Sequence, residues 1–193
     1  KSVTEDMASS GSADRFIAYC VAKGVRAIVA ASVPDSIFVS RHREELASRG
    51  IQSLTCEDPE THIRLDHKWL CHEWLSGHGV AQPRTLPVRA DTVAACRDLV
   101  EANAARGNPC FFKRTFDTCA GDGVAKVTSL EEYHAAVKKL SGGGGAQPAD
   151  TSGAEQQLIL QQGHPGDVHE GQAIFYRGEL VACYLTKENP EMI

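Results

Sequence analysis

The sequence predicts an α/β protein, because helical patterns alternate along it with short apolar strands. Apolar side chains recur at helical spacing over residues 16–21, and the apolar run at 25–31 is typical of a strand buried on both faces. A helix over 34–50, bounded by a proline and a glycine, and a short strand over 51–55 repeat this order. Buried strands separated by helices indicate a parallel sheet.

The helices after residue 64 are expected to pack on a second core. A helix that Asp66 can cap is expected to turn Leu70 and Trp74 toward that core. A short extended segment at 84–88 follows, and the next helix is expected to begin at a capping Asp91. One face of that helix is apolar and consists of Val93, Cys96 and Val100.

The remaining segments predict strands more often than helices. Strands are expected over 108–113 and 123–127, and a capping box from Ser129 to Glu132 opens a helix with an apolar stripe. Residues 141–155 are rich in glycine, proline and serine, which predicts a flexible surface connection. Three further strands, of which the last two form a hairpin, are predicted over 157–162, 169–176 and 180–186.

Composition excludes several classes of partner. The formal net charge is -5 and Lys and Arg are dispersed along the 193 residues, so no basic surface for nucleic acid or an acidic membrane is expected. No segment approaches the roughly 18 apolar residues that a membrane span needs. The seven cysteines are odd in number and lie mostly in apolar runs, which indicates reduced thiols and a cytoplasmic location. The sequence leaves the oligomeric state open, a homo-oligomer included.

The loop between the strands at 108–113 and 123–127 has two interpretations. It could be a plain hairpin connection, because glycines between two strands commonly form turns. It could also cradle an anion, because Lys113 ends the first strand and small residues leave backbone N–H groups exposed in the loop. Arg114 is an alternative to Lys113 as the charged contact. The histidines have no ligand-like spacing, so no zinc site is expected.

Three segments together resemble the ATP-grasp superfamily, and within it the carbamoyl phosphate synthetase and carboxylate-amine ligase branches. The segments are DHKWL…GHGVAQPRT from residue 66, NPCFFKRTFDTCAGDGVAKV from 108, and LILQQGHPGDVHEGQAIFYRGEL from 158. They follow the family's order of a basic residue that opens a helix, a strand ending in Lys or Arg, a glycine-containing flap and a hinge strand. The resemblance covers roughly residues 25–186 and implies a partial ATP-grasp fold.

The resemblance also implies a nucleotide site. Lys113 matches the residue that contacts the α- and β-phosphates, residues 115–123 match the flap over the triphosphate, and 160–163 match the hinge that meets the adenine. The basic residue at the helix start is Lys68 or His67, with Lys68 favoured. The family's ribose-binding acid falls on Val168 or His169, with Glu170 next to them. The nucleotide-binding residues expected on this basis are Lys68, Lys113, Thr115, Ala120, Gly121, Gly123, Gln161, Gln162, Gly163, His169 and Glu170.

Three regions are expected along the chain. Residues 1–12 form a loose N-terminal segment, 13–64 the end of a Rossmann-like α/β domain, and 65–193 an ATP-grasp domain. Within the last region, a small subdomain covers about 105–162 and a large subdomain begins at 163–193. The sequence starts without an initiator Met and stops just after a predicted strand, so a fragment of a longer protein is expected.

The activity that the resemblance implies is ATP-dependent joining of a small carboxylate to an amine through an acyl phosphate. ATP and Mg²⁺ are the expected cofactors, with the Mg²⁺ ligands beyond the end of this chain. No residue is assigned a catalytic role, and the substrate cannot be read from the sequence. Two alternatives stay open: a non-catalytic ATP-grasp-like module that binds nucleotide or regulates, and a generic α/β domain with a chance match.

Overall fold

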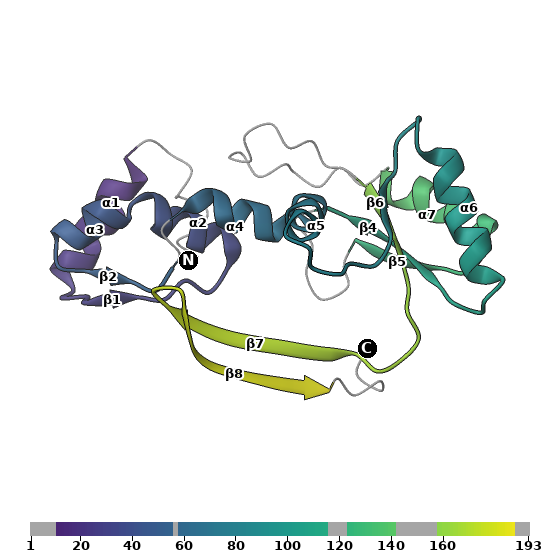
Figure 1. The fold of residues 1–193 in the computed structure, drawn as a ribbon. Helices are drawn as coiled ribbons and strands as arrows, with labels where there is room; N and C mark the ends of the chain where they lie inside the picture. Colours follow the sequence, from purple (N-terminus) through teal and green to yellow (C-terminus); the bar gives the residue numbers. More distant parts are fainter. Residues whose placement is uncertain (1–10, 56–57, 116–122, 142–157, 188–193) are drawn as a thin grey trace.

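The first part of the chain is a small α/β unit with a parallel sheet. The computed structural model describes residues 11–55, 58–115, 123–141 and 158–187. The elements of the first unit are α1 (Ser12–Ala22), β1 (Ala27–Ile28), α2 (Val33–Arg41), α3 (Arg43–Ser48) and β2 (Gln52–Ser53). β1 and β2 pair in parallel, with Ala27 opposite Gln52 and Ile28 opposite Ser53. The parallel sheet expected from the alternating pattern is therefore present (Figure 1).

Two predictions for this unit need correction. The strand expected over 25–31 is only two residues long and is not buried on both faces, since Val29 is 72% exposed. In the described part of the chain this sheet has two strands, so β1 lacks the neighbours that would cover it. The helix expected over 34–50 is two helices that meet at His42. The core of this first unit consists of Ile17, Cys20, Val39, Leu46 and Ile51.

Two helices follow the first unit: α4 (Pro59–Asp66), which the sequence did not predict, and α5 (Lys68–Gly77). The sequence predicts Asp66 as the cap of α5, but Asp66 is the last residue of α4. His67 is the cap instead, and its Nδ1 accepts a hydrogen bond from the backbone N–H of Leu70 at 3.2 Å. Trp74 was expected in a core but is 39% exposed, and α5 buries none of its residues fully.

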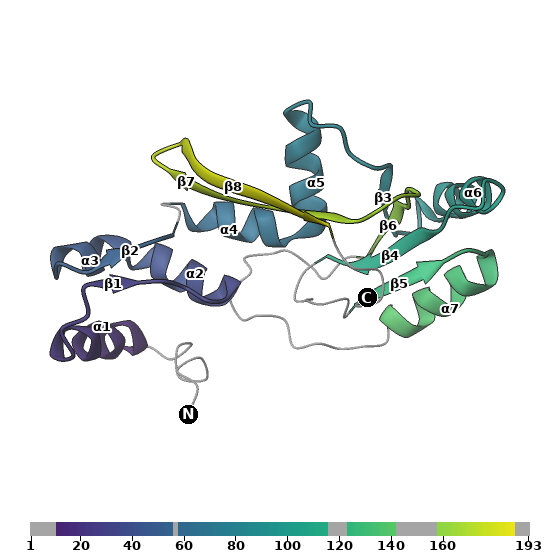
Figure 2. The ribbon, with the colours of Figure 1, turned by 90° about the horizontal axis from the view of Figure 1, so that it is seen from below.

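The centre of the structure is a four-stranded antiparallel sheet with the strand order β3-β6-β4-β5. Figures 1 and 2 show α6 and α7 on one side of this sheet and α5 on the other. The elements are β3 (Thr85–Pro87), α6 (Val93–Ala104), β4 (Cys110–Arg114), β5 (Val124–Val127), α7 (Leu130–Ser141) and β6 (Leu158–Gln162). β6 lies between β3 and β4, so the end of this unit is hydrogen-bonded to its beginning.

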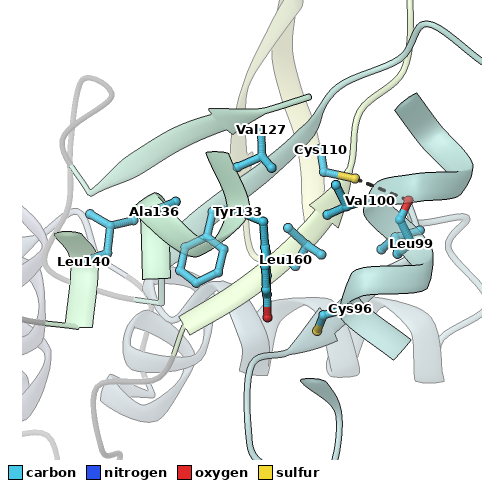
Figure 3. Close-up of a cluster of buried hydrophobic side chains, with 10 residues drawn as sticks. Cys96, Leu99, Val100, Cys110, Val127, Tyr133, Ala136, Leu140 and Leu160 are labelled. Atoms are coloured by element: carbon cyan, nitrogen blue, oxygen red, sulfur yellow. Dashed lines mark hydrogen bonds between the residues drawn. The ribbon is translucent and has the colours of Figure 1, made fainter. Parts of the chain in front are cut away.

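The main hydrophobic core lies between this sheet and the two helices. Phe112 and Tyr133 are both almost fully buried and meet edge to face, with their ring centroids 5.8 Å apart. Cys96 and Cys110 lie in the same core as free thiols, as the sequence predicted (Figure 3). The cluster consists of Cys96, Leu99, Val100, Cys110, Phe112, Val127, Tyr133, Ala136, Leu140 and Leu160.

The helix starts differ in detail from the prediction. Thr92, rather than Asp91, is the cap residue of α6, and Val93 is exposed at its first turn instead of joining the apolar face. At the start of α7, Ser129 Oγ accepts from the N–H of Glu132 at 3.2 Å, as the capping box requires. The Glu132 carboxylate bonds the N–H of Thr128 at 2.6 Å, one residue earlier than expected.

The last described elements form the predicted hairpin, β7 (His169–Tyr176) and β8 (Glu179–Lys187). The turn residues Arg177 and Gly178 both have positive φ, at 51° and 83°, as a tight two-residue hairpin turn requires. Every residue of the two strands is exposed. The hairpin leaves the end of β6 and runs back toward the first unit (Figures 1 and 2). Among the described helices, none combines the length and apolar character that crossing a membrane requires.

Candidate functional site

The candidate site lies on the face of the four-stranded sheet that α6 and α7 do not cover. Successive side chains of a strand point to opposite faces, and residues paired across strands share a face. Thr85 pairs with Gln161, and Gln161 pairs with Phe111, so these three side chains stand in one row across β3, β6 and β4. Lys113 lies two residues along β4 from Phe111 and shares this face, whereas Phe112 points into the core.

The ammonium of Lys113 is held in place by its neighbours in this row. Its Nζ donates to Gln161 Oε1 at 2.7 Å and lies 5.7 Å from the centroid of the Phe111 ring. Gln161 Nε2 donates in turn to Thr85 Oγ1 at 3.1 Å. The Thr85 hydroxyl donates to the carbonyl of Pro83 at 2.9 Å. Among the described residues, a neutral amide is thus the hydrogen-bond partner of Lys113.

A second lysine approaches from α5, on the same side of the sheet. The backbone N–H of Lys68 donates to the carbonyl of Thr115 at 2.7 Å, which attaches the start of α5 to the end of β4. Burial lowers the pKa of Lys113, and the charge of Lys68 lowers it further. Burial also lowers the pKa of Lys68, and the negative charge of Asp66 partly offsets this by raising it. The start of α5 is therefore attached next to Lys113, near enough for the charge of Lys68 to lower the pKa of Lys113.

This arrangement favours an anion. Two partly buried ammonium groups that repel each other are costly to keep charged, and an anion between them would offset both the repulsion and the lost hydration. The backbone at the start of α5 adds the positive end of a helix dipole beside Lys68. A phosphate group, with several acceptor oxygens, matches this set of donors.

The structure also separates the residues that the sequence left as alternatives. His67 is 4% exposed and caps α5 through Nδ1, and burial lowers its pKa, so its ring is held mainly in the neutral form. Arg114 follows Lys113 in β4 and by alternation points to the other face of the sheet. Lys113 shares the face of Gln161, and so does the exposed Lys126 on β5, which pairs with Phe111. Lys68 approaches Lys113 from α5.

The hinge residues have different surroundings. Gln162 pairs with Cys110, so its side chain lies on the helix-covered face, opposite to Gln161. Its N–H donates to the carbonyl of Arg84 at 2.8 Å, and the N–H of Gly163 donates to the carbonyl of Pro109 at 2.9 Å. These two backbone donors are engaged inside the sheet, so they are not the groups that would meet an adenine.

The remaining predicted residues lie beside the end of β4, at the start of β7 or outside the described part. Gly123 opens β5 with φ of 68° and accepts from the N–H of Arg114 at 2.9 Å. His169 and Glu170 are exposed at the start of β7, where Glu170 accepts from Gln172 Nε2 at 2.8 Å. Ala120 and Gly121 lie outside the described residues.

Sequence reasoning missed Thr85 and the carbonyl of Pro83 as members of the site. Thr85 is 6% exposed and completes the chain of hydrogen bonds from Lys113. The residues of β3 alternate, so the strand pattern would have placed Thr85 and Leu86 on opposite faces. The pairing of β3 with β6, across a long stretch of sequence, could not be read from that pattern.

The described residues of the candidate site do not include a set of metal ligands. In the ranges that the structure describes, no group of three His, Cys, Asp or Glu side chains could hold a metal ion. No described residue is therefore assigned to Mg²⁺, and no chemical step is routed through it.

Several solved structures share this fold, among them the following three. D-alanyl-alanine synthetase A from Vibrio cholerae matches 82% of this chain with a TM-score of 0.53 and 18% identity. Carboxyaminoimidazole ribonucleotide synthase from Aspergillus clavatus, complexed with ATP, matches 96% with a TM-score of 0.58 and 14% identity. N5-carboxyaminoimidazole ribonucleotide synthetase from Thermus thermophilus matches 94% with a TM-score of 0.57 and 22% identity.

The similarity to these proteins is structural. No family model and no curated protein matches the sequence. The chain spans 41 to 43% of the length of the three structures described above. At these identities the comparison shows a shared fold over part of their length.

Proposed function

The chain carries part of the ATP-grasp fold, and from this premise we propose that the complete protein is an ATP-dependent carboxylate-amine ligase or a related carbon–nitrogen ligase. The observation that supports this function is the Lys113 ammonium held by Gln161 on the face that α6 and α7 do not cover, with the start of α5 and Lys68 beside it. In such a reaction a carboxylate oxygen attacks the γ-phosphorus of ATP and ADP leaves. An amine then attacks the acyl carbon of the resulting acyl phosphate, and phosphate leaves.

The described residues would contribute by binding and orienting the nucleotide. Lys113 and Lys68 would neutralise phosphate oxygens, and the phosphates would be held in one place relative to the carboxylate. Phosphoryl transfer depends largely on such positioning and charge stabilisation. Mg²⁺ is proposed as the cofactor of the complete protein, which would supply charge neutralisation at the transferred phosphate.

The structural neighbours support this choice of substrate and reaction class. One of them is a structure complexed with ATP, and the names of the others describe synthetases. The proposal names only the classes of the two substrates, a carboxylate and an amine, because the names of the three structural neighbours specify different products.

The alternative function is nucleotide binding without turnover. Val168, which is half-exposed just before β7, stands where the family resemblance expects an acid that contacts the ribose. Loss of that contact would weaken a nucleotide site, and a weakened site could serve regulation alone.

Both functions can be tested on the full-length protein that contains this chain. Isothermal titration is expected to show MgATP binding, which Lys113→Ala weakens about 10- to 100-fold, the range for losing a hydrogen bond to a charged group. Lys139→Ala is the matched control, because Lys139 is exposed on α7, and α7 covers the face of the sheet opposite to the candidate site (Figure 2). Unaltered binding in Lys113→Ala, or no binding by the wild type, would contradict the proposed site.

Turnover is measured separately. The wild type is incubated with MgATP, hydroxylamine and a panel of small carboxylates, and ADP and hydroxamate are measured. A ligase that forms an acyl phosphate is expected to release ADP only with its own carboxylate and to give the hydroxamate with hydroxylamine. Tight MgATP binding with no ADP release would favour the binding module over the ligase.

A further inference from the structure

The side chain of Gln161 forms hydrogen bonds with both Lys113 and Thr85. Because both ends of its amide are engaged, its role differs from recognition of the adenine base. We propose that Gln161 is a positioning residue that fixes the Lys113 ammonium for phosphate binding, through a hydrogen-bond chain anchored at the Pro83 carbonyl. This role presupposes the ATP-binding function proposed above. It assigns the side chain to the phosphate end of the site, whereas the hinge resemblance would assign it to the adenine.

The direction of the hydrogen bonds fixes the orientation of the Gln161 amide. A lysine ammonium can only donate, so the atom of Gln161 that faces it must be the carbonyl oxygen, Oε1. The NH₂ group then faces Thr85 Oγ1, which must accept. The Thr85 hydroxyl keeps its own proton for the carbonyl of Pro83. All donors in the chain therefore run one way, from Lys113 to the Pro83 carbonyl.

The chain also explains how a flexible lysine is held on an open face. Lysine has four rotatable side-chain bonds and ordinarily extends its ammonium toward water. Here Oε1 of Gln161 holds Nζ at 2.7 Å, and Thr85, which is 6% exposed, is itself fixed in the sheet. The ammonium is therefore oriented before a ligand arrives, and less conformational entropy is lost on binding.

A neutral partner suits this task better than an acid would. A carboxylate at position 161 would hold Lys113 equally well but would cancel the positive charge that attracts a phosphate. An amide provides the same acceptor geometry without neutralising the lysine. The charged groups on this side of the sheet include Lys68 on α5, whose charge lowers the pKa of Lys113, and Lys126 on β5, which pairs with Phe111.

The two possible roles of Gln161 are separated by splitting ATP into its parts. The full-length protein is titrated with tripolyphosphate, adenosine and MgATP, in the wild type and in Gln161→Leu. If Gln161 positions Lys113, tripolyphosphate and MgATP are expected to bind about tenfold more weakly in Gln161→Leu, and adenosine binding is unchanged. Gln52→Leu, at an exposed position on β2, is the matched control and is expected to bind all three as the wild type does.

The opposite pattern would overturn the positioning role. Weaker adenosine binding with unchanged tripolyphosphate binding would show that Gln161 reads the base. Unchanged binding of all three ligands would show that it does neither. If the wild type binds neither MgATP nor tripolyphosphate, the proposed function fails first and the positioning role fails with it, so the two failures are told apart by the wild-type titration.

Two further variants separate positioning from a general effect on folding. Gln161→Glu keeps the acceptor but adds a charge, so tripolyphosphate is expected to bind more weakly at neutral pH, while its binding persists to higher pH than in the wild type. Thr85→Val removes only the hydroxyl and is expected to weaken tripolyphosphate binding by a smaller factor, which Thr85→Ser restores. The role of the hydrogen-bond chain is excluded by two results together. Tripolyphosphate binding by Gln161→Glu is lost at the same alkaline pH as in the wild type, and Thr85→Val binds as the wild type does.

Discussion

The antiparallel strand pairs β4–β5 and β7–β8 of this protein lie in opposite surroundings. The β4–β5 hairpin is paired with β6 and covered by α6 and α7, and its Phe112 is fully buried. The β7–β8 hairpin pairs only within itself among the described elements, and its Phe175 is 64% exposed. Both consist of two antiparallel strands that carry apolar residues. The comparison shows that alternation specifies a strand, whereas neighbouring elements decide whether that strand is buried.

The same comparison explains where the candidate site lies. A strand that is covered on one face and open on the other can bury Phe112 and present Lys113 from adjacent positions. The β7–β8 hairpin has no such support, and its predicted site residues, His169 and Glu170, are exposed like the rest of it. Rigid placement of a charge thus depends on the packing behind the strand.

The largest expected difference between the hairpins is the effect of truncating their phenylalanines. Phe112→Ala would leave a cavity against Tyr133 and is expected to lower the free energy of unfolding by about 3–5 kcal/mol. Phe175→Ala removes an exposed ring and is expected to change it by no more than about 0.5 kcal/mol. Urea unfolding of the full-length protein, followed by circular dichroism, measures both. An equal loss in the two variants would mean that Phe175 is also packed in solution.

A smaller difference is expected at two glycines, Gly163 directly after β6 and Gly171 on β7. A Cβ at Gly163 would lie 2.5 Å from the Pro109 carbonyl oxygen, and that contact is with backbone that cannot easily move. Gly163→Ala is therefore expected to lower the free energy of unfolding by about 1–3 kcal/mol. A Cβ at Gly171 would meet only the end of the Leu185 side chain, at 3.2 Å.

Gly171→Ala serves as the control for this effect, because Leu185 is 80% exposed and can rotate away. Thermal unfolding of both variants is the measurement. If Gly163→Ala unfolds at the wild-type temperature, the close approach between β6 and the residue before β4 is looser than the structure has it.

Much of the fold could be predicted from sequence, because local patterns carried it. The strands at 108–113 and 123–127, the stripe of α7 and the final hairpin all follow from alternation, helical spacing and turn residues. The errors fall where tertiary surroundings decide the outcome. Trp74 is exposed although its helix is amphipathic, and the strand at 25–31 is short because it has few neighbours.

The site could be predicted only in part, for the same reason. Lys68 and Lys113 were predicted because their segments resemble known motifs, and in the structure the charge of Lys68 lowers the pKa of Lys113. Gln161 and Gln162 are adjacent in sequence and look alike, yet strand alternation puts them on opposite faces. Thr85 joins the site through a pairing between β3 and β6 that no local signal announces.

The smallest expected effect concerns the cost of keeping Lys113 charged. Burial and Lys68 lower the pKa of Lys113 in the folded protein, whereas in the unfolded chain it returns to about 10.4. Between these two values the unfolded state binds more protons, so the free energy of unfolding rises with pH across that window. Lys113→Met removes the charge and is expected to be as stable as the wild type or more so at neutral pH, by less than about 1 kcal/mol since solvent screens part of the ammonium.

Nucleotide affinity is expected to change in the opposite direction over the same window. When Lys113 loses its proton, the fold is relieved of a buried charge, but the site loses the cation that would hold a phosphate. Urea unfolding and MgATP titration between neutral and alkaline pH measure the two trends in the full-length protein. The control is Lys187→Met on β8, whose partner Asp167 forms an exposed ion pair with it. If stability and affinity rise together in the wild type, or if Lys113→Met retains the pH dependence, the ammonium of Lys113 is not the group that ties folding to binding.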